Sequence, residues 1–311
     1  MFPKTLAMTP FFPTFALHKL LNSCMSKKQI LLALLLILVA VAAITTSQSS
    51  GSDPADAPAP ADDEAPAPVS DDAPQPVDNE APQLNLLLQT TPSGVPAKLI
   101  ERRAYTTSYN SATRTANWVA WTLTREHTYG SHQRTDERFE EDLDVAKPRA
   151  TYQDYYDSRY DRGHLCPAGD NKWDPEAMKE TFLMTNICPQ DHDLNKEDWN
   201  TLEQQCRAWA RRYGEVTIVC GPVFDADGQP RRIGRNKVRV PDAFFKVVYR
   251  SKPEPAALSV VMRNTASPQP WEEHVLTVDE VEAMTGIDFF PSLPDETEQK
   301  VESATSLTDW Q

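Results

Sequence analysis

The sequence lacks the short motifs that mark several large enzyme classes. Its 311 residues contain no Walker loop, no dinucleotide-binding glycine fingerprint, no serine nucleophile elbow and no HExxH motif. The five cysteines never occur as C-x-x-C, so the usual spacing of a zinc site is missing as well. These absences disfavour the classes of enzyme that the motifs mark.

Basic residues are absent from residues 51–82, which carry nine acidic groups, and residues 291–311 hold one lysine against five acids. Residues 1–50 show the opposite imbalance, with four lysines and no acid. Of the net charge of −14, residues 83–290 therefore account for only −5, from 31 acidic and 26 basic residues. This mildly acidic part allows a local basic groove but excludes a broadly basic surface that coats DNA.

One long apolar run, ILLALLLILVAVAAI, spans residues 30–44 and follows two lysines. Its fifteen residues fall short of the roughly 20 that a membrane-spanning helix needs. The run fits the apolar part of a signal peptide, for which residues 41–43 (Val-Ala-Ala) offer a small-residue cleavage site. The alternative is an uncleaved anchor that tethers the protein to a membrane.

The beginning of the chain has two interpretations. Met25 precedes Ser-Lys-Lys, so translation can start there. If residues 1–24 are real, they are basic and acid-free and resemble an organelle transit segment. We expect an extracytoplasmic protein, whether secreted, periplasmic or membrane-anchored, with a mitochondrial location as the alternative.

Composition divides the chain into four segments. Residues 45–84 are rich in Ser, Pro, Ala, Asp and Glu and have almost no large apolar side chains, so they cannot bury enough surface to offset the entropy of ordering. We therefore expect a signal or anchor region at 1–46, a disordered linker at 47–97, a folded domain at 98–294 and a loose acidic tail at 295–311.

Strands dominate the folded domain. Apolar side chains at spacings of three and four predict one helix over Leu194–Tyr213. A capping box at 277–280, followed by Gly286, predicts a second, short helix. Four segments are typical of strands, the last two suiting an antiparallel hairpin: Trp118–Thr124, Val216–Phe224, Ala243–Arg250 and Leu258–Met262. Because helices do not alternate regularly with strands, we expect an α+β fold rather than a doubly wound α/β fold.

A histidine in a distinctive setting occupies the end of Asp161-Arg162-Gly163-His164. Histidine is the side chain best suited to take a proton from water near neutral pH. Gly163 lets backbone or ligand approach closely, and Arg162 presents a planar fork to phosphate oxygens. For Asp161, a salt bridge or a structural hydrogen bond is the simpler role.

Three further polar residues, Asn186, Asn195 and Glu203, could hold a cation. Mg²⁺ prefers oxygen ligands and keeps most of its waters, so one amide oxygen and one carboxylate acting through water are sufficient. In one continuous helix, Asn195 and Glu203 would differ by about 80° and lie ~12 Å apart along the axis. Direct binding of one ion by both is therefore difficult, and the structural alternative makes them a helix cap and a solvated charge. With His164 as base, the set permits in-line hydrolysis of a phosphodiester.

Motifs through most of the domain resemble the DNA/RNA non-specific endonucleases of the ββα-metal superfamily, which includes the Serratia-type nuclease and endonuclease G. The resemblance implies a central antiparallel sheet flanked by helices, with a β-hairpin and the helix of Asn195 at the metal site. The stretches that carry it are DRGHLCPAGD (161–170), TFLMTNICPQ (181–190), LNKEDWNTLE (194–203), IVCGPVF (218–224), VPDAFFKVV (240–248) and TVDEVEAMTGIDFFPSLPD (277–295).

Carried over by position, the resemblance implies His164 as the general base and Asn195 as the sole direct protein ligand of Mg²⁺, or of Mn²⁺ or another divalent cation. Glu203 would hold water that is bound to the ion. Asn186 and Arg162 would lie in the catalytic site, with Arg162 near the phosphate.

The resemblance also implies two further basic positions that contact substrate. Arg207, one turn after Glu203, matches the first. The second is an upstream arginine within HQRTDERFEEDLD, for which we favour Arg134 over Arg138.

We thus expect a Mg²⁺-dependent endonuclease that cuts DNA and RNA and leaves 5′-phosphates. One alternative is a catalytically silent nucleic-acid-binding protein on the same fold. Another is a phosphodiesterase for a small or lipid substrate, which the acidity of the domain and the membrane-proximal linker favour. The four cysteines of the domain either form one or two disulfides, Cys166 with Cys188 among them, or remain reduced as small buried residues.

Overall fold

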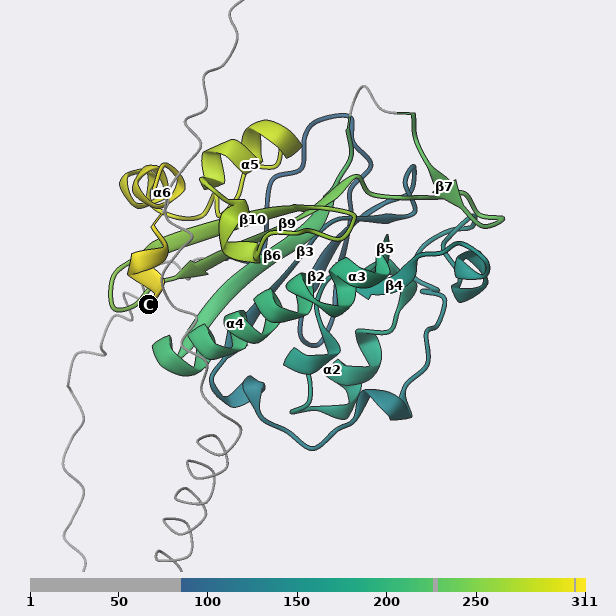
Figure 1. Ribbon diagram of the computed structural model, residues 1–311, viewed down its shortest axis with the longest axis horizontal. Coiled ribbons are helices and arrows are strands. Elements are labelled where there is room, and N and C mark those ends of the chain that lie inside the picture. Colours follow the sequence, from purple (N-terminus) through teal and green to yellow (C-terminus); the bar gives the residue numbers. More distant parts are fainter. Residues whose placement is uncertain (1–84, 226–228, 305) are drawn as a thin grey trace, which may run out of the picture. The chain divides into compact units, whose positions relative to one another are not determined.

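The structure is a computed structural model that describes residues 85–225, 229–304 and 306–311 (Figure 1). The expected signal or anchor region, the alternative start at Met25 and most of the expected linker lie outside the described residues. No helix within the described ranges is long and apolar enough to cross a membrane.

A seven-stranded antiparallel sheet forms the centre of the fold, in the order β1-β2-β3-β6-β9-β10-β11. The four strands expected from the sequence are β3, β6, β9 and β10, and the last two form the expected hairpin. The α+β class is confirmed. The strands span Lys98–Glu101 (β1), Thr106–Asn110 (β2), Thr115–Thr124 (β3), Glu215–Val223 (β6), Ala243–Arg250 (β9), Ala256–Arg263 (β10) and Val275–Leu276 (β11).

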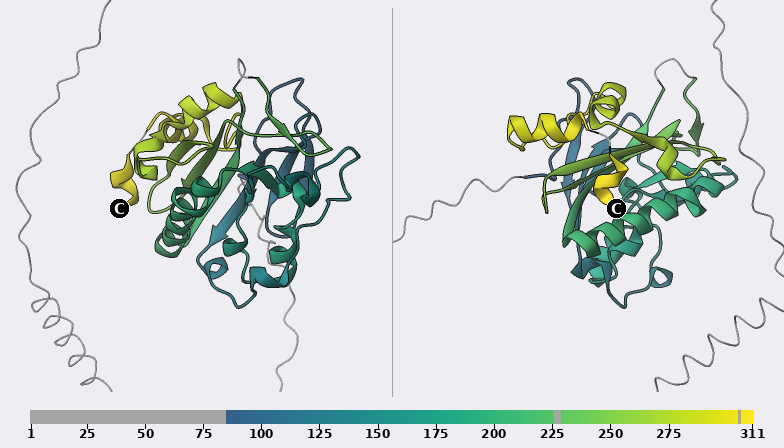
Figure 2. Two further views of the ribbon diagram at one scale, coloured as in Figure 1. Left: turned by 45° about the vertical axis from the view of Figure 1, so that its right-hand side comes forward. Right: turned by 60° about the vertical axis from the view of Figure 1, so that its left-hand side comes forward.

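Helices cover both faces of this sheet, as Figure 2 shows. Helix α4 (Asp198–Tyr213) lies on one face, and helices α5 (Val278–Thr285) and α6 (Asp295–Glu302) lie on the other. Each face of the sheet packs against its helices in a separate hydrophobic core. Because side chains alternate along a strand, β3 contributes to both cores: Val119 packs on the α4 side, whereas Trp118 packs on the side of α5 and α6. This two-sided burial explains why the central strands are almost continuously apolar.

A smaller sheet lies beside the large one and leads directly into helices (Figure 1). Strand β4 (Asp161–His164) pairs antiparallel with β5 (Ile187–Gln190), and helices α3 (His192–Lys196) and α4 follow. A second hairpin, β7 (Arg232–Ile233) with β8 (Val238–Arg239), packs against β5 through Ile233 and Val238. Helix α2 (Pro175–Glu180) lies between β4 and β5 in the sequence.

The single helix expected over Leu194–Tyr213 is in fact two helices, α3 and α4, which meet at Glu197 with φ −104° and ψ −93°. At 100° per residue, a continuous helix would turn Leu194 about 140° away from Trp199. Both side chains are buried in the same core. The break at Glu197 allows both side chains to be buried in that core. It also places Asn195 in α3 and Glu203 in α4.

The folded part extends beyond the expected boundaries at both ends. Gln89 accepts a hydrogen bond from the Phe290 backbone at 2.7 Å, and Thr90 bridges to Asp288. The expected loose tail from residue 295 is corrected as well, because Trp310 is buried and its carbonyl accepts a hydrogen bond from Trp209 Nε1 at 3.0 Å. Because the tail is rich in acidic residues, its composition did not indicate that apolar residues such as Trp310 would pack against the domain.

The short helix α5 has the ends that the sequence predicts. Thr277 and Glu280 form a capping box, in which each side chain bonds the backbone N–H of the other. Gly286 follows the helix in the left-handed conformation, with φ 68°. This pairing of caps fixes where α5 begins and ends, and so where its acidic side chains lie.

Candidate active site

A polar pocket of about 360 Å³ opens where β4, α3 and α4 meet. Its wall contains five of the seven residues expected from the sequence, and these come from separate segments of the chain: Arg134, Arg162, His164, Asn195 and Glu203. Arg138, the alternative to Arg134, is not among the lining residues. The β4–β5 hairpin and the two helices therefore bring the expected groups together.

Strand β4 places His164 in the pocket. Its ring packs edge-on against Phe182 at 4.9 Å and lies 5.5 Å from Phe139. The Nε2 atom is buried and has no hydrogen-bond partner within the described residues. Burial, with a smaller effect of Arg134, lowers the pKa of His164 to about 3. The ring is therefore neutral near pH 7 and has a nitrogen lone pair that can accept a proton.

Gly163 sets how closely the two strands of the hairpin approach. A Cβ at this position would lie 2.6 Å from Cβ of Gln190, so any other residue would force β4 and Gln190 apart. Glycine thus lets β4 lie against the buried Gln190 of β5. The close pairing of the two strands positions the histidine that follows.

Asp161 orients Asn195. Its Oδ2 atom accepts a hydrogen bond from Nδ2 of Asn195 at 3.0 Å and lies 3.0 Å from Nδ1 of His192. An ionised carboxylate can only accept, so the amide nitrogen must face Asp161 and the amide oxygen must face away from it. Asp161 therefore has the structural hydrogen-bonding role expected from the sequence, and it leaves Oδ1 of Asn195 available to a ligand.

Glu203 lies on the pocket wall above a buried lysine. Burial raises the pKa of Glu203 to about 7, although Lys246 and two arginines lower it. Lys246 is 1% exposed, and its Nζ lies 4.8 Å from the centre of the Trp199 ring and 5.2 Å from that of Trp121. This cation-π setting holds a permanent positive charge behind the carboxylate.

The donor set suits a hard divalent cation. An amide oxygen of Asn195 and the carboxylate of Glu203 are both oxygen donors, and the rest of the polar pocket is open to water and substrate. Few protein ligands are needed, since Mg²⁺ commonly keeps most of its waters. The residues present therefore fit the metal that the sequence led us to expect.

Two expected site residues lie elsewhere. Asn186 is fully buried, and its amide makes three hydrogen bonds to backbone atoms, two with Cys166 and one with the carbonyl of Thr181. It braces the turn after His164 and does not line the pocket. Arg207 also does not line the pocket, because it forms an ion pair with the buried Asp170 at 2.7 Å.

The pocket also contains groups that the sequence reasoning did not assign. Lys196 and Asn200 line it, the first just after Asn195 and the second one turn before Glu203. Lys246 lies behind it. A lone lysine within the apolar strand AFFKVVYR was the available signal for Lys246, because a charge on a buried strand requires a partner.

The four cysteines of the described residues form no disulfide. Cys166, Cys188, Cys206 and Cys220 are all free and buried. The alternative of small buried residues is therefore the one realised, and the disulfide considered between Cys166 and Cys188 is not formed in the described part of the chain. The hydrogen bonds of Asn186 brace this region instead.

Comparisons with known proteins agree with this geometry. Residues 84–296 match the family described as DNA/RNA non-specific endonuclease. Human mitochondrial endonuclease G is 35% identical over 218 residues, covering 64% of this chain and 72% of that protein. The mitochondrial nuclease EXOG of Xenopus laevis is 36% identical over 220 residues, with shares of 64% and 61%.

A bacterial relative and a solved structure extend the likeness. A protein from a Nostoc species named "Nuclease" is 32% identical over 237 residues, covering 71% of this chain and 85% of its own length. A crystal structure of EndoG in complex with EndoGI superposes with a TM-score of 0.60 at 28% identity. That match covers 66% of this chain and 91% of the solved chain.

Proposed function

Because the chain belongs to the DNA/RNA non-specific endonuclease family, we propose that it cuts DNA and RNA at the pocket around His164. The observation that carries the proposal is the position of His164. A neutral imidazole, whose buried Nε2 has no partner in the described residues, stands in one pocket with two arginines and a free amide oxygen. These are a base, anion-binding groups and a cation ligand.

His164 takes a proton from the attacking water as that water adds to phosphorus. Arg134 and Arg162 stabilise the negative charge that develops on the phosphate. The Arg162 guanidinium lies 5.0 Å from the Phe139 ring, and its Nε is buried without a partner in the described part of the chain, so this donor remains for a phosphate.

Asn195 and Glu203 would hold a divalent cation, Mg²⁺ in our proposal. Asn195 supplies its amide oxygen, and Glu203 holds water on the ion. When bound, the cation supplies positive charge that stabilises the phosphate and the leaving oxygen. The protein contributes by orienting Asn195 through Asp161 and by placing the charge of Lys246 near Glu203, which favours the ionised carboxylate.

The flanking polynucleotide, we propose, runs from the pocket along the β7–β8 hairpin. Arg231 at the base of the hairpin donates to the hydroxyl of Tyr160 at 2.8 Å, and Tyr160 directly precedes β4. Arg235 and Lys237 are exposed at the tip, and Asp154 anchors the turn by accepting two hydrogen bonds from Asn236. The hairpin thus offers basic groups to phosphates on a braced support.

The test of the hairpin is the salt dependence of nucleic-acid affinity. In the inactive His164→Ala background, the combined Arg235→Ala and Lys237→Ala changes should reduce the slope of log affinity against log salt by about 2, one per lost phosphate contact. Lys300→Ala on α6 is the control and should leave the slope unchanged. An unchanged slope in the hairpin variant would exclude this path.

The test of the nuclease is digestion of plasmid DNA and of RNA with Mg²⁺ or with EDTA. Wild type should degrade both substrates only with the metal, and His164→Ala should not. His274→Ala, a histidine that does not line the pocket, is the matched control. Inactivity of a well-folded wild type would favour a silent binding protein. Cleavage of a small phosphodiester without digestion of either polymer would favour a phosphodiesterase for small substrates.

For location, we propose that residues 1–46 direct the protein out of the cytoplasm or into an organelle. The apolar run at 30–44 after two lysines supports an extracytoplasmic destination or a membrane tether. The mitochondrial names of the endonuclease G and EXOG relatives support the mitochondrial alternative. Sequencing of the mature N-terminus, with cell fractionation, separates a cleaved signal from an intact anchor.

A further inference from the structure

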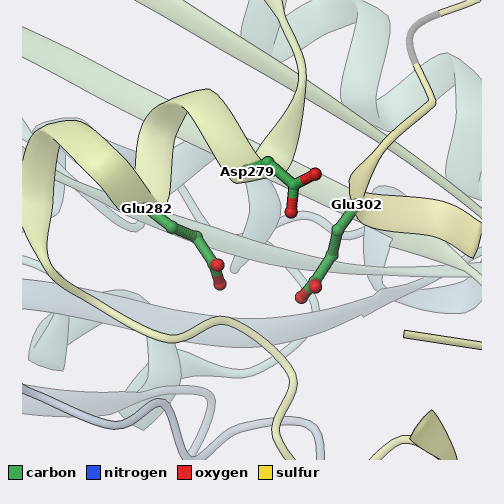
Figure 3. Close-up of side chains that lie close together, drawn as sticks. All are labelled: Asp279, Glu282 and Glu302. Atoms are coloured by element: carbon green, nitrogen blue, oxygen red, sulfur yellow. The ribbon is translucent and has the colours of Figure 1, made fainter. Parts of the chain in front are cut away.

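A second group of acidic side chains lies on the face of the sheet opposite to α4. Asp279 and Glu282 of α5 and Glu302 at the end of α6 converge, as Figure 3 shows. One carboxylate oxygen from each residue lies within 4.8 Å of those of the other two. Asp279 and Glu282 lie within the residues that match the nuclease family, whereas Glu302 lies beyond them, so the matched segment does not contain the whole cluster.

Glu302 is buried without a partner. The residue is 8% exposed, and its Oε1 atom is buried with no hydrogen bond within the described residues. A buried carboxylate without a donor or a cation is costly, because it has lost its hydration and gained nothing in return. Its position as the last residue of α6 adds to the cost, since the carbonyl end of a helix carries partial negative charge.

The charged neighbours that most affect Glu302 are all carboxylates. The carboxylates of Glu298 and Asp288 also lie near it. None of the ion pairs formed in the described ranges involves any of these acids. Glu282 is fixed in place by the Phe289 backbone N–H, which donates to its Oε1 at 2.8 Å, and this leaves its other oxygen for a ligand.

We propose that Asp279, Glu282 and Glu302 bind a divalent cation of the calcium type that fastens α6 to α5. Ca²⁺ takes six to eight oxygen ligands at roughly 2.3–2.6 Å in flexible geometry, so two oxygens on one ion can lie up to about 5 Å apart. The separations in the cluster satisfy that limit. Asp279 is exposed, so water can complete the shell on its side.

Calcium is favoured over the other common cations by the chemistry of the donors. Zn²⁺ prefers nitrogen and sulfur ligands, which these three residues do not offer. Mg²⁺ demands near-ideal octahedral geometry and rarely takes several protein carboxylates at once. The bound ion would stabilise the position of α6. The segment after α6 leads to Trp310, which packs on α4, so the ion would also support that contact.

The experiment is thermal unfolding of the metal-stripped full chain, titrated with CaCl₂ or MgCl₂. Because the active site would also bind a divalent cation, all variants carry Asn195→Ala, which removes the ligand there. We expect Ca²⁺ to raise the melting temperature, with a smaller rise for Mg²⁺ at equal concentration. The readout is independent of nuclease activity, so failure of either proposal is recognised separately.

Three variants decide the result. Glu302→Gln should abolish the rise with Ca²⁺ and, without metal, should melt at the same or a higher temperature than its parent, because repulsion is relieved. Asp279→Asn, an exposed change that should not disturb folding, should weaken the response. Glu296→Gln, an exposed acid on the same helix, should keep the full response. Absence of a rise in the parent, or an equal rise in Glu302→Gln, would overturn the proposal.

Discussion

Two glutamates of this chain are withdrawn from water in opposite electrostatic settings. Burial raises the pKa of Glu203 to about 7; Lys246, Arg207 and Arg134 lower it, and the single neighbouring carboxylate of Asp170 raises it. Burial also raises the pKa of Glu302 to about 8, and there the neighbouring charges are carboxylates that raise it further. Cationic side chains of the protein therefore partly offset the cost of burying Glu203. The cost of burying Glu302 is offset instead by a proton or by a cation from solution.

The difference teaches what each region can do. Around Glu203 both cationic side chains and carboxylates are present, which suits a site that accepts a divalent cation together with a negative phosphate. Around Glu302 only negative charge accumulates, which can hold a cation but would repel a phosphate. A cluster of carboxylates alone, as around Glu302, thus suits a structural cation. A site that combines a carboxylate, an amide and cationic side chains, as around Glu203, suits phosphodiester hydrolysis.

The largest expected effect separates the two regions by activity. His164→Ala should reduce the rate of plasmid cleavage by about 10²–10⁴-fold, because the general base is lost. Glu302→Gln should stay within about twofold of wild type under the same conditions, as its helix contributes nothing to the pocket lining. Initial rates at saturating Mg²⁺ measure both. A large loss in Glu302→Gln would mean that the regions are coupled.

Lys246→Met tests whether an internal cation is what distinguishes the regions. Lys246 acts on Glu203 through its charge and forms no ion pair with it in the described residues, so we expect a destabilisation of about 0.5–3 kcal/mol. The folded pKa of Glu203 is already raised, so the stability it contributes is present at low pH and is lost as pH rises through about 7. Removing Lys246 raises that pKa further.

The variant should therefore be nearly as stable as wild type at pH 5 and most destabilised at pH 8. Urea unfolding of metal-free protein at the two pH values measures this. Lys300→Met, on the surface of α6, is the control. An equal loss of stability at both pH values would show that packing against Trp121 and Trp199, and not charge, is what Lys246 provides.

The sequence predicted which residues line the pocket better than how the chain brings them together. His164, Asn195 and Glu203 lie in motifs that resemble the nuclease family, and all three line the pocket. The break at Glu197 depends on burying Leu194 and Trp199 in one core, which helical periodicity does not encode. Local pattern thus indicated the long apolar strands β3, β6, β9 and β10, but not how a helix breaks to satisfy tertiary packing.

The sequence was less informative about residues whose position depends on contacts with other segments of the chain. Asn186 has an amide side chain that could bind a ligand, and it lies in a motif that resembles the nuclease family. Its side chain instead forms hydrogen bonds with Cys166 and Thr181. Glu302 gave no signal in an acidic tail, because its burial arises only when α6 packs beside α5. Such contacts join segments far apart in the sequence, or use backbone atoms that every residue has.

Asp161→Asn tests the support of the pocket. The neutral amide oxygen of asparagine is a weaker acceptor than a carboxylate, and its NH₂ group can face Asn195 in its place, so the amide of Asn195 should lose its fixed orientation. Loss of such a partner beside a metal ligand typically costs about 10–100-fold in metal affinity or activity. A Mg²⁺ titration of the cleavage rate should show a higher half-saturating concentration. An unchanged Mg²⁺ requirement would remove Asp161 from the support of the ion.

The smallest expected effect is a pH dependence that belongs to Glu302. Its folded pKa of about 8 lies above the ordinary value of 4.5, so metal-free protein holds a proton there that the unfolded chain releases. The associated stability is complete below about pH 4.5 and is lost as pH rises to about 8, with a slope of at most about 1.4 kcal/mol per pH unit. Glu302→Gln should flatten this part of the stability curve, whereas Glu296→Gln should not. If instead the slope persists in Glu302→Gln, the buried charge is carried by another carboxylate of the cluster, and the contrast with Glu203 fails.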